Sequence, residues 1–174
     1  IHTGGIDHIP VHHENEIAQS ECATHKQFVR YWVHHDFLNV EGEKMSKSKQ
    51  NFYTLDDITA RNIDPVATRL MFMQTSYRKP LNFTWESLDV AAQQLKKLEK
   101  FAMHHHIIGN VDQSYLNAFT DCLSEDLNTA KALASVWELV ADTELLEEDK
   151  WATLLAFDAV LGLGLAQVPK FSIS

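Results

Sequence analysis

Apolar residues recur every three or four positions through most of the second half of the chain, a spacing typical of amphipathic helices. The longest such run follows Thr84 and consists of Leu88, Ala91, Leu95, Leu98 and Ala102. The pattern predicts further helices over about 113–123, 128–142 and 147–161, separated by short polar stretches. Residues 82–166 are therefore expected to form an antiparallel helical bundle.

The first half of the chain has a mixed pattern. It predicts a helix over 12–29, a strand in the aromatic and β-branched stretch 31–40, and a polar loop over 41–51. Two helix starts follow, because Thr54 and Asp57 have capping-box spacing and Asp64 precedes a proline. The expected fold class is thus mainly α with a small α/β portion.

Composition places the chain among globular proteins, with 45% apolar and 22% charged residues. We see no apolar run long enough to cross a bilayer, and we expect no membrane partner. The net charge is −9, and residues 101–174 hold 11 acidic but only 3 basic residues. A general nucleic-acid binder would be basic, so any RNA contact should be local. Two cysteines distant in sequence, Cys22 and Cys122, favour a reducing, cytoplasmic location.

The stretch "VHHENEIAQSE" at 11–21 raises the question of a metal site. His12 and Glu16 are four residues apart, so on a helix they would share one face and could bind one ion. Two ligands are too few for a closed site, and a solvated polar helix face is the more common meaning of such a pair. Taken alone, the pair leaves both interpretations open.

Two loops suggest nucleotide chemistry. Gly4 and Gly5 leave the backbone open to close approach by a ligand, and Asp7 follows at a position where sugar hydroxyls are often held. In "KMSKS" at 44–48, Lys44, Lys47 and Ser48 could surround a polyphosphate, whose charge the lysines would neutralise. Taken alone, a glycine pair is more often an ordinary turn, and a short lysine-rich segment is more often a solvated basic loop.

The order and spacing of "GGID", "HHENEIAQSE", "KMSKS" and "YRKPLNF" resemble the cysteinyl-tRNA synthetases, a family of class I aminoacyl-tRNA synthetases. The segments "DLNTAKALASVWELV" and "VLGLGL" are similar to later parts of the same family, so the resemblance extends from residue 1 to about 166. It implies the second half of a Rossmann-type catalytic domain followed by the helical bundle. The implied enzyme is a cysteine–tRNA ligase, which activates cysteine with ATP and Mg and transfers it to its tRNA.

The resemblance also assigns roles to residues. His12 and Glu16 match two of four ligands of a zinc ion that binds the substrate thiolate, and His2 matches a residue of the cysteine pocket. The positions that match ATP-binding residues are Gly4, Gly5, Asp7, Lys47 and Ser48. Lys44 and Lys47 would carry the catalytic role of the lysine loop. Zinc would favour cysteine over serine, because a thiolate binds zinc far better than a hydroxyl does.

The resemblance divides the chain into four parts. Residues 1–52 would be the end of the nucleotide-binding domain, 53–81 a helical connector, 82–166 the tRNA-binding type of bundle, and 167–174 a tail. Arg78 and Lys79 are the expected tRNA contacts, and the protein is expected to be a monomer. The "HIGH" motif and the two zinc cysteines of the family are absent, so this chain is expected to be an incomplete and, alone, inactive fragment.

Three departures and two alternatives accompany this interpretation. Thr3 replaces the first of three family glycines, and Lys49 and Gln50 replace Leu-Gly after "KMSKS", a change expected to alter closure of that loop. The third departure is the missing "HIGH" half. One alternative is a mycothiol-type ligase that couples cysteine to a sugar amine, although "ENEIAQSE" favours the synthetase. The other is a truncated, non-catalytic module that contacts tRNA or a partner.

Overall fold

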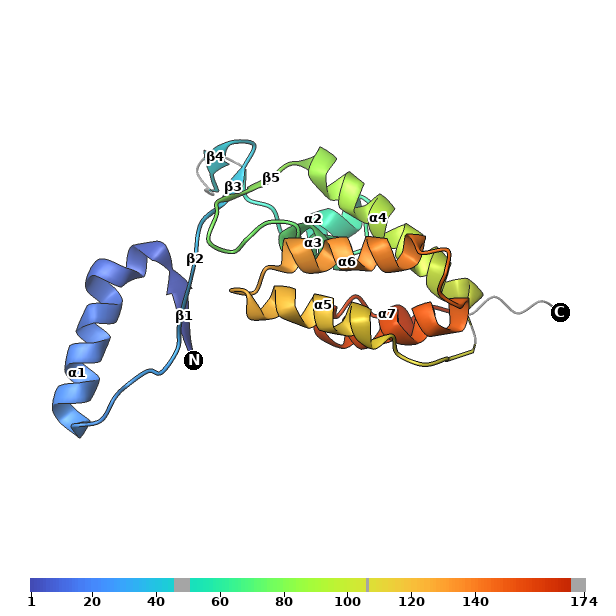
Figure 1. The fold of residues 1–174 in the computed structure, drawn as a ribbon. Coiled ribbons are helices and arrows are strands. Elements are labelled where there is room, and N and C mark those ends of the chain that lie inside the picture. Colours follow the sequence, from blue (N-terminus) through green and yellow to red (C-terminus); the bar gives the residue numbers. More distant parts are fainter. Residues whose placement is uncertain (46–50, 106, 170–174) are drawn as a thin grey trace. The chain divides into compact units, whose positions relative to one another are not determined.

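The fold was analysed in a computed structural model that describes residues 1–45, 51–105 and 107–169. The chain forms two compact units, which are described separately (Figure 1). The first contains Ile1–Phe52 and Tyr77–Phe83, and the second contains Tyr53–Ser76 and Thr84–Ser174. The four-part division made from the sequence stays a prediction.

The first unit begins with a parallel strand pair joined through a helix. Strand β1 (His2–Gly5) pairs with β2 (Trp32–His35), and helix α1 (Glu14–Thr24) lies between them in sequence. A 3-10 turn (Ile6–His8) and a π-helical turn (Ile9–His13) lead into α1. The helix predicted over 12–29 is therefore too long at its C-terminal end, while residues 12 and 13 at its start belong to the π-helical turn. Its C-terminal limit is His25, which adopts the left-handed conformation with φ 54° and ends the helical hydrogen bonding.

A second sheet in the same unit has the order β4-β3-β5. Strand β3 (Leu38–Val40) runs antiparallel to β4 (Glu43–Lys44) and parallel to β5 (Leu81–Phe83). The single strand predicted over 31–40 is wrong, since the chain leaves the first sheet at Asp36, whose Oδ1 accepts a hydrogen bond from the N–H of Phe37 at 2.7 Å. Lys44 belongs to a short strand instead of the predicted loop, because positive φ angles at Glu41 and Gly42 turn the chain back on itself.

The second unit contains six α-helices and a C-terminal 3-10 turn (Leu165–Gln167) within the described residues. The α-helices are α2 (Leu55–Ala60), α3 (Val66–Met73), α4 (Trp85–His104), α5 (Gln113–Ser124), α6 (Thr129–Ala141) and α7 (Glu147–Leu161). The predicted helix start at Thr54 is confirmed by a capping box with Asp57, and Thr84 forms a second capping box with Ser87. The start predicted at Asp64 is one residue early, because Pro65 is the N-cap of α3, although Asp64 accepts a hydrogen bond from the N–H of Val66 at 2.8 Å.

The core of this unit lies where α3 packs on α4 and where α5, α6 and α7 pack together. Phe119 of α5 and Phe157 of α7 stack with ring centroids 4.2 Å apart, and both are almost fully buried. The largest other fully buried side chains are Leu70, Leu88, Leu95, Leu98, Val136, Leu139, Leu154, Leu161 and Leu165. The predicted apolar stripe of α4 is thus confirmed as its buried face.

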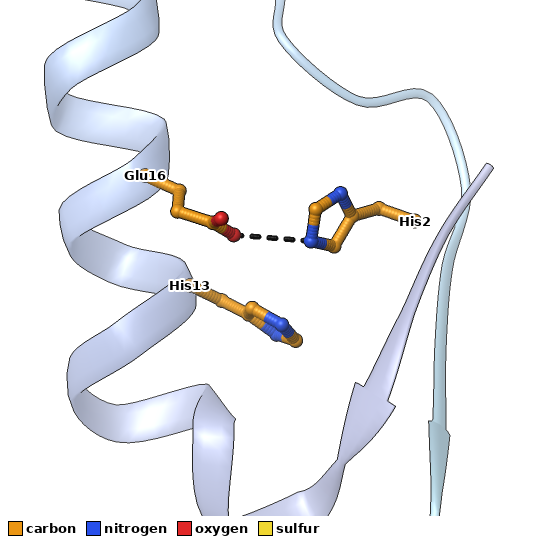
Figure 2. A group of neighbouring side chains, drawn as sticks. All are labelled: His2, His13 and Glu16. Carbon is orange, nitrogen blue, oxygen red and sulfur yellow. Dashed lines mark ion pairs between the residues drawn. The ribbon is translucent and has the colours of Figure 1, made fainter.

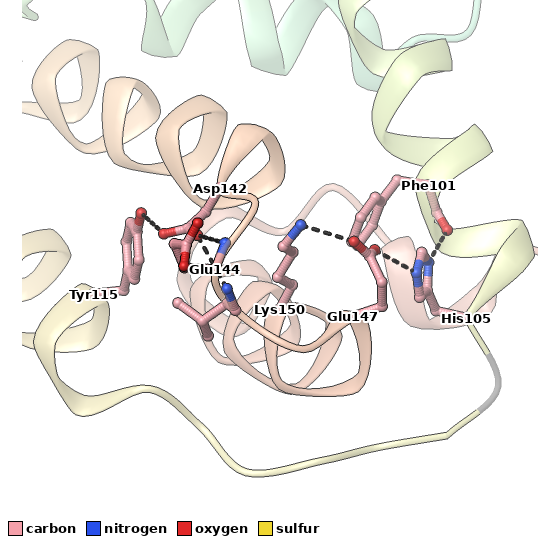
Figure 3. A network of polar contacts seen from close by, with 8 residues as sticks. Phe101, His105, Tyr115, Asp142, Glu144, Glu147 and Lys150 are labelled. Carbon is pink, nitrogen blue, oxygen red and sulfur yellow. Dashed lines mark hydrogen bonds and ion pairs between the residues drawn. The ribbon is translucent and has the colours of Figure 1, made fainter.

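Polar contacts join the helix ends (Figure 3). The hydroxyl of Tyr115 donates to Asp142 at 2.8 Å, and this hydrogen bond is the main cause that raises the pKa of Tyr115 to about 12. Buried Lys150 donates to Glu147 at 2.8 Å, and the opposite oxygen of that carboxylate lies 2.9 Å from His105 Nε2. The Lys150 hydrogen bond is the largest cause that lowers the pKa of Glu147.

The C-terminal end of α7 is held by a buried carboxylate. Asp158 accepts hydrogen bonds from the backbone N–H groups of Leu163 at 2.7 Å and Leu165 at 2.8 Å. Gly162 takes the left-handed conformation with φ 64°, and Arg69 of α3 donates from Nε to the carbonyl of Leu161. These contacts satisfy backbone groups that a helix end otherwise leaves without partners. None of the described helices has an apolar stretch long enough to cross a membrane.

Candidate functional site

One face of the β1–β2 pair carries the histidines of the candidate site. In the parallel register His2 is opposite Trp32 and Gly4 is opposite His34, so these four positions lie on one face of the sheet. The π-helical turn brings His13 over this face. Its ring centroid lies 4.8 Å from that of Trp32 and 5.0 Å from that of His2.

Glu16, on the first turn of α1, faces this cluster (Figure 2). Its Oε2 lies 3.0 Å from Nε2 of His2, and its Oε1 lies 3.5 Å from Nε2 of His12. Oε2 is buried and has no hydrogen bond of acceptable geometry. Donor atoms of His2, His13 and Glu16 all lie within 4.8 Å of one another, close enough to hold one metal ion after small side-chain movements.

His13 is the most buried side chain of the cluster, with 4% of its surface exposed. Its Nδ1 lies 2.8 Å from Nε2 of His34, so one ring donates a hydrogen bond to the other. Burial, followed by the proximity of His34 and His2, lowers the pKa of His13 and favours the neutral imidazole. A neutral imidazole is the form that binds metals.

No role was expected for His13, because adjacent residues on a helix point in different directions and only His12 shares a face with Glu16. His2 and Gly4 are two residues apart, as are Trp32 and His34, and this spacing in the sequence indicates that each pair lies on one face of its strand. The helical argument itself holds for His12, which does face the carboxylate of Glu16.

The glycine loop is closely packed. A side chain at Gly5 would collide with the carboxylate of Asp7, and one at Gly4 would lie 2.7 Å from Cε1 of His13. Asp7 is exposed in the 3-10 turn that follows β1. The structure therefore brings Gly4, Gly5 and Asp7 together at the end of β1, beside the histidine cluster.

The remaining predicted residues belong to other elements of the chain or lie outside the described residues. Lys44 is exposed on β4, with Nζ 5.4 Å from the ring centroid of Phe37. Lys47 and Ser48 lie outside the described residues. Arg78 and Lys79 are exposed just before β5, and the Arg78 guanidinium lies 5.1 Å from the ring centroid of Tyr77.

Two family models match the chain. The model of the class I (C) tRNA synthetase catalytic domain matches residues 1–93, and the DALR domain matches 118–166. The chain is 43% identical over 168 residues to cysteine–tRNA ligase 1 of Burkholderia lata, covering 96% of this chain. It is 45% identical over 152 residues to the cysteine–tRNA ligase of Solibacter usitatus, covering 82% of this chain. It spans 36% and 33% of the lengths of these two relatives.

A solved structure supports the fold. The LeuRS of Agrobacterium radiobacter K84, in a ternary complex with tRNA and LeuAMS, matches with a TM-score of 0.64 and 16% identity. The match covers 94% of this chain and 25% of that one. The expected fold class, a class I catalytic portion followed by a helical bundle, is confirmed.

Proposed function

Because this chain belongs to the family of class I (C) tRNA synthetase catalytic domains, we propose that the protein containing it is a cysteine–tRNA ligase. It would activate cysteine with ATP and transfer it to the tRNA for cysteine, as a monomer in the cytoplasm. The main support for this proposal is that relatives 43% and 45% identical to the chain are named cysteine–tRNA ligases. The candidate site is consistent with it, because imidazole and carboxylate donors meet beside a glycine loop.

Zinc fits the donor atoms on this face. In a tetrahedral site, metal–ligand bonds of about 2.0–2.2 Å place two donors roughly 3.4 Å apart. The separation of 3.5 Å between His12 Nε2 and Glu16 Oε1 matches this value, and Oε2 of Glu16 lacks a hydrogen bond. We propose that His12 and Glu16 hold the ion, which supplies a strong site for the substrate thiolate. His2, whose Nε2 faces Glu16, would line the cysteine pocket.

The nucleotide would bind at the end of β1. Gly4 and Gly5 end this strand, and the exposed carboxylate of Asp7 beside them can accept hydrogen bonds from ribose hydroxyls. Lys44, Lys47 and Ser48 would bind the phosphates of ATP–Mg, with Lys47 stabilising the leaving pyrophosphate by its charge. Replacing Lys47 by Ala should therefore slow ATP–pyrophosphate exchange, whereas Lys26→Ala, an exposed lysine after α1, should not.

Arg78 and Lys79 are the proposed tRNA contacts in the first unit. Both are exposed and adjacent, which suits contact with the phosphate backbone. The double variant Arg78→Gln, Lys79→Gln should weaken tRNA binding and make the salt dependence shallower by about one unit per lost contact. Unchanged affinity and salt dependence would rule this contact out.

The central test is cysteine-dependent ATP–pyrophosphate exchange by the full-length protein, followed by aminoacylation of tRNA. We expect exchange with cysteine and far less with serine. Glu16→Gln should lower both the bound zinc and the preference for cysteine, while Glu14→Gln, an exposed neighbour on the same turn, should change neither. Equal exchange with serine and cysteine would contradict the proposed function.

A further inference from the structure

His13 and His34 form a hydrogen-bonded pair that the proposed assignment of ligands leaves without a role. Their nitrogens are 2.8 Å apart and their ring centroids 4.9 Å apart. His34 comes from β2 and His13 from the turn before α1, so the pair ties the turn to the sheet. Trp32 also supports both rings, lying parallel to His34 with an interplanar angle of 4° and 4.8 Å from His13.

The position of His13 depends on the absence of a side chain at Gly4. Gly4 lies opposite His34 in the parallel register, so a Cβ there would point to the same face as the His34 side chain. That Cβ would lie 2.7 Å from Cε1 and 2.9 Å from Nε2 of His13. The imidazole of His13 therefore fills the space that Gly4 leaves open beside His34.

His13 in turn contacts His2, the residue whose Nε2 faces Glu16. The two rings meet edge to face, with an interplanar angle of 89°. The His2 ring is held on its other sides by Trp32 and Phe28, whose centroids lie 4.9 Å and 5.6 Å away. A fixed His13 therefore restricts where His2 and the Glu16 carboxylate can lie.

We propose that His34 is a positioning residue, which holds His13 in the space above Gly4 and thereby fixes His2 and Glu16 in the geometry that binds zinc and cysteine. This inference rests on the proposed function and adds two residues to it. Groups that orient metal ligands from outside the ligand set usually contribute 10–100-fold to affinity or activity. His34 would act in this way through its hydrogen bond and ring contact with His13, and through the ring contact between His13 and His2.

The test compares His34→Ala, His34→Gln and Gly4→Ala in the full-length protein. We expect His34→Ala to weaken zinc binding, measured by competition with a chelator, by about 10–100-fold. The KM for cysteine should rise in parallel while the KM for ATP changes little. His34→Gln keeps a group that can donate or accept the hydrogen bond, and it should restore most of the zinc affinity.

Gly4→Ala should also weaken zinc binding, by a different route, because it displaces His13 and leaves His34 intact. Combining it with His34→Ala should weaken zinc binding no further than the stronger single change, since both act through one contact. His35→Ala is the matched control. His35 follows His34 on β2, belongs to the opposite face, is exposed, and bonds only to the carbonyl of Asp36 among the described contacts.

The outcomes separate this inference from the proposed function. If the unaltered protein activates cysteine but His34→Ala leaves zinc affinity and the KM for cysteine unchanged, the positioning role is wrong and the function stands. If the unaltered protein binds zinc without activating cysteine, the function is wrong, and zinc affinity still tests the positioning role. Absence of zinc from the unaltered protein would overturn both. A loss of thermal stability without selective loss of zinc and cysteine binding would also overturn the positioning role.

Discussion

Replacing Asp158 by Ala should destabilise the helical unit by several kilocalories per mole. The side chain is 9% exposed and accepts two backbone hydrogen bonds, from Leu163 and Leu165. Leu163 and Leu165 are themselves buried, at 5% and 0% exposure, so water cannot easily replace the lost acceptor. Each buried N–H left without a partner costs about 1–3 kcal/mol, which gives a total of about 4 kcal/mol.

Asp158→Asn should reduce the free energy of unfolding by an intermediate amount. The amide keeps one oxygen, so it can accept from only one of the two N–H groups and places its own donors near the other. We expect roughly half the loss caused by Asp158→Ala. The control is Asp121→Asn, an exposed change on α5 that should alter the free energy of unfolding by less than about 0.5 kcal/mol.

The measurement is urea unfolding, followed by helical ellipticity and by tryptophan fluorescence, to which the buried Trp151 of α7, 2% exposed, contributes. Losses should appear as a lower midpoint with an unchanged slope. If Asp158→Ala lowers the free energy of unfolding by less than about 1 kcal/mol, or by no more than Asp121→Asn does, the buried carboxylate does not hold the end of α7. The estimated loss from two N–H groups without an acceptor would then be wrong.

Three further results are expected. Phe157→Ala should cost about 3–5 kcal/mol in the same urea assay, because it removes a fully buried ring, and a loss below about 1 kcal/mol would contradict the packing described. The hydrogen bond to Asp142 raises the pKa of Tyr115 from 10.0 to about 12. The stability that this hydrogen bond gives the folded protein is therefore complete below pH 10 and is lost as the pH rises toward 12. Tyr115→Phe should remove that alkaline loss in pH-dependent melting, and an identical alkaline profile would count against it. Cys22 is exposed and Cys122 buried, so a thiol reagent should label the first in the native protein and the second only on unfolding.

The sequence alone determined two helix caps, the helical bundle and the proximity of His12 to Glu16. Thr54 and Thr84 cap their helices through residues three positions later, so the signal is local and readable from the chain. The buried stripe of α4 was equally predictable, because helical periodicity selects the face that packs. The proximity of His12 to Glu16 follows from the same spacing rule.

Only the tertiary structure decided which residues surround that pair. The division of 31–40 into β2 and β3 depends on pairing with β1 in one sheet and β5 in the other, which no local pattern encodes. The same pairing places Gly4 opposite His34 and leaves the space that His13 fills. His13 therefore joins the site through contacts between segments distant in sequence, and such contacts exist only once the strands have paired.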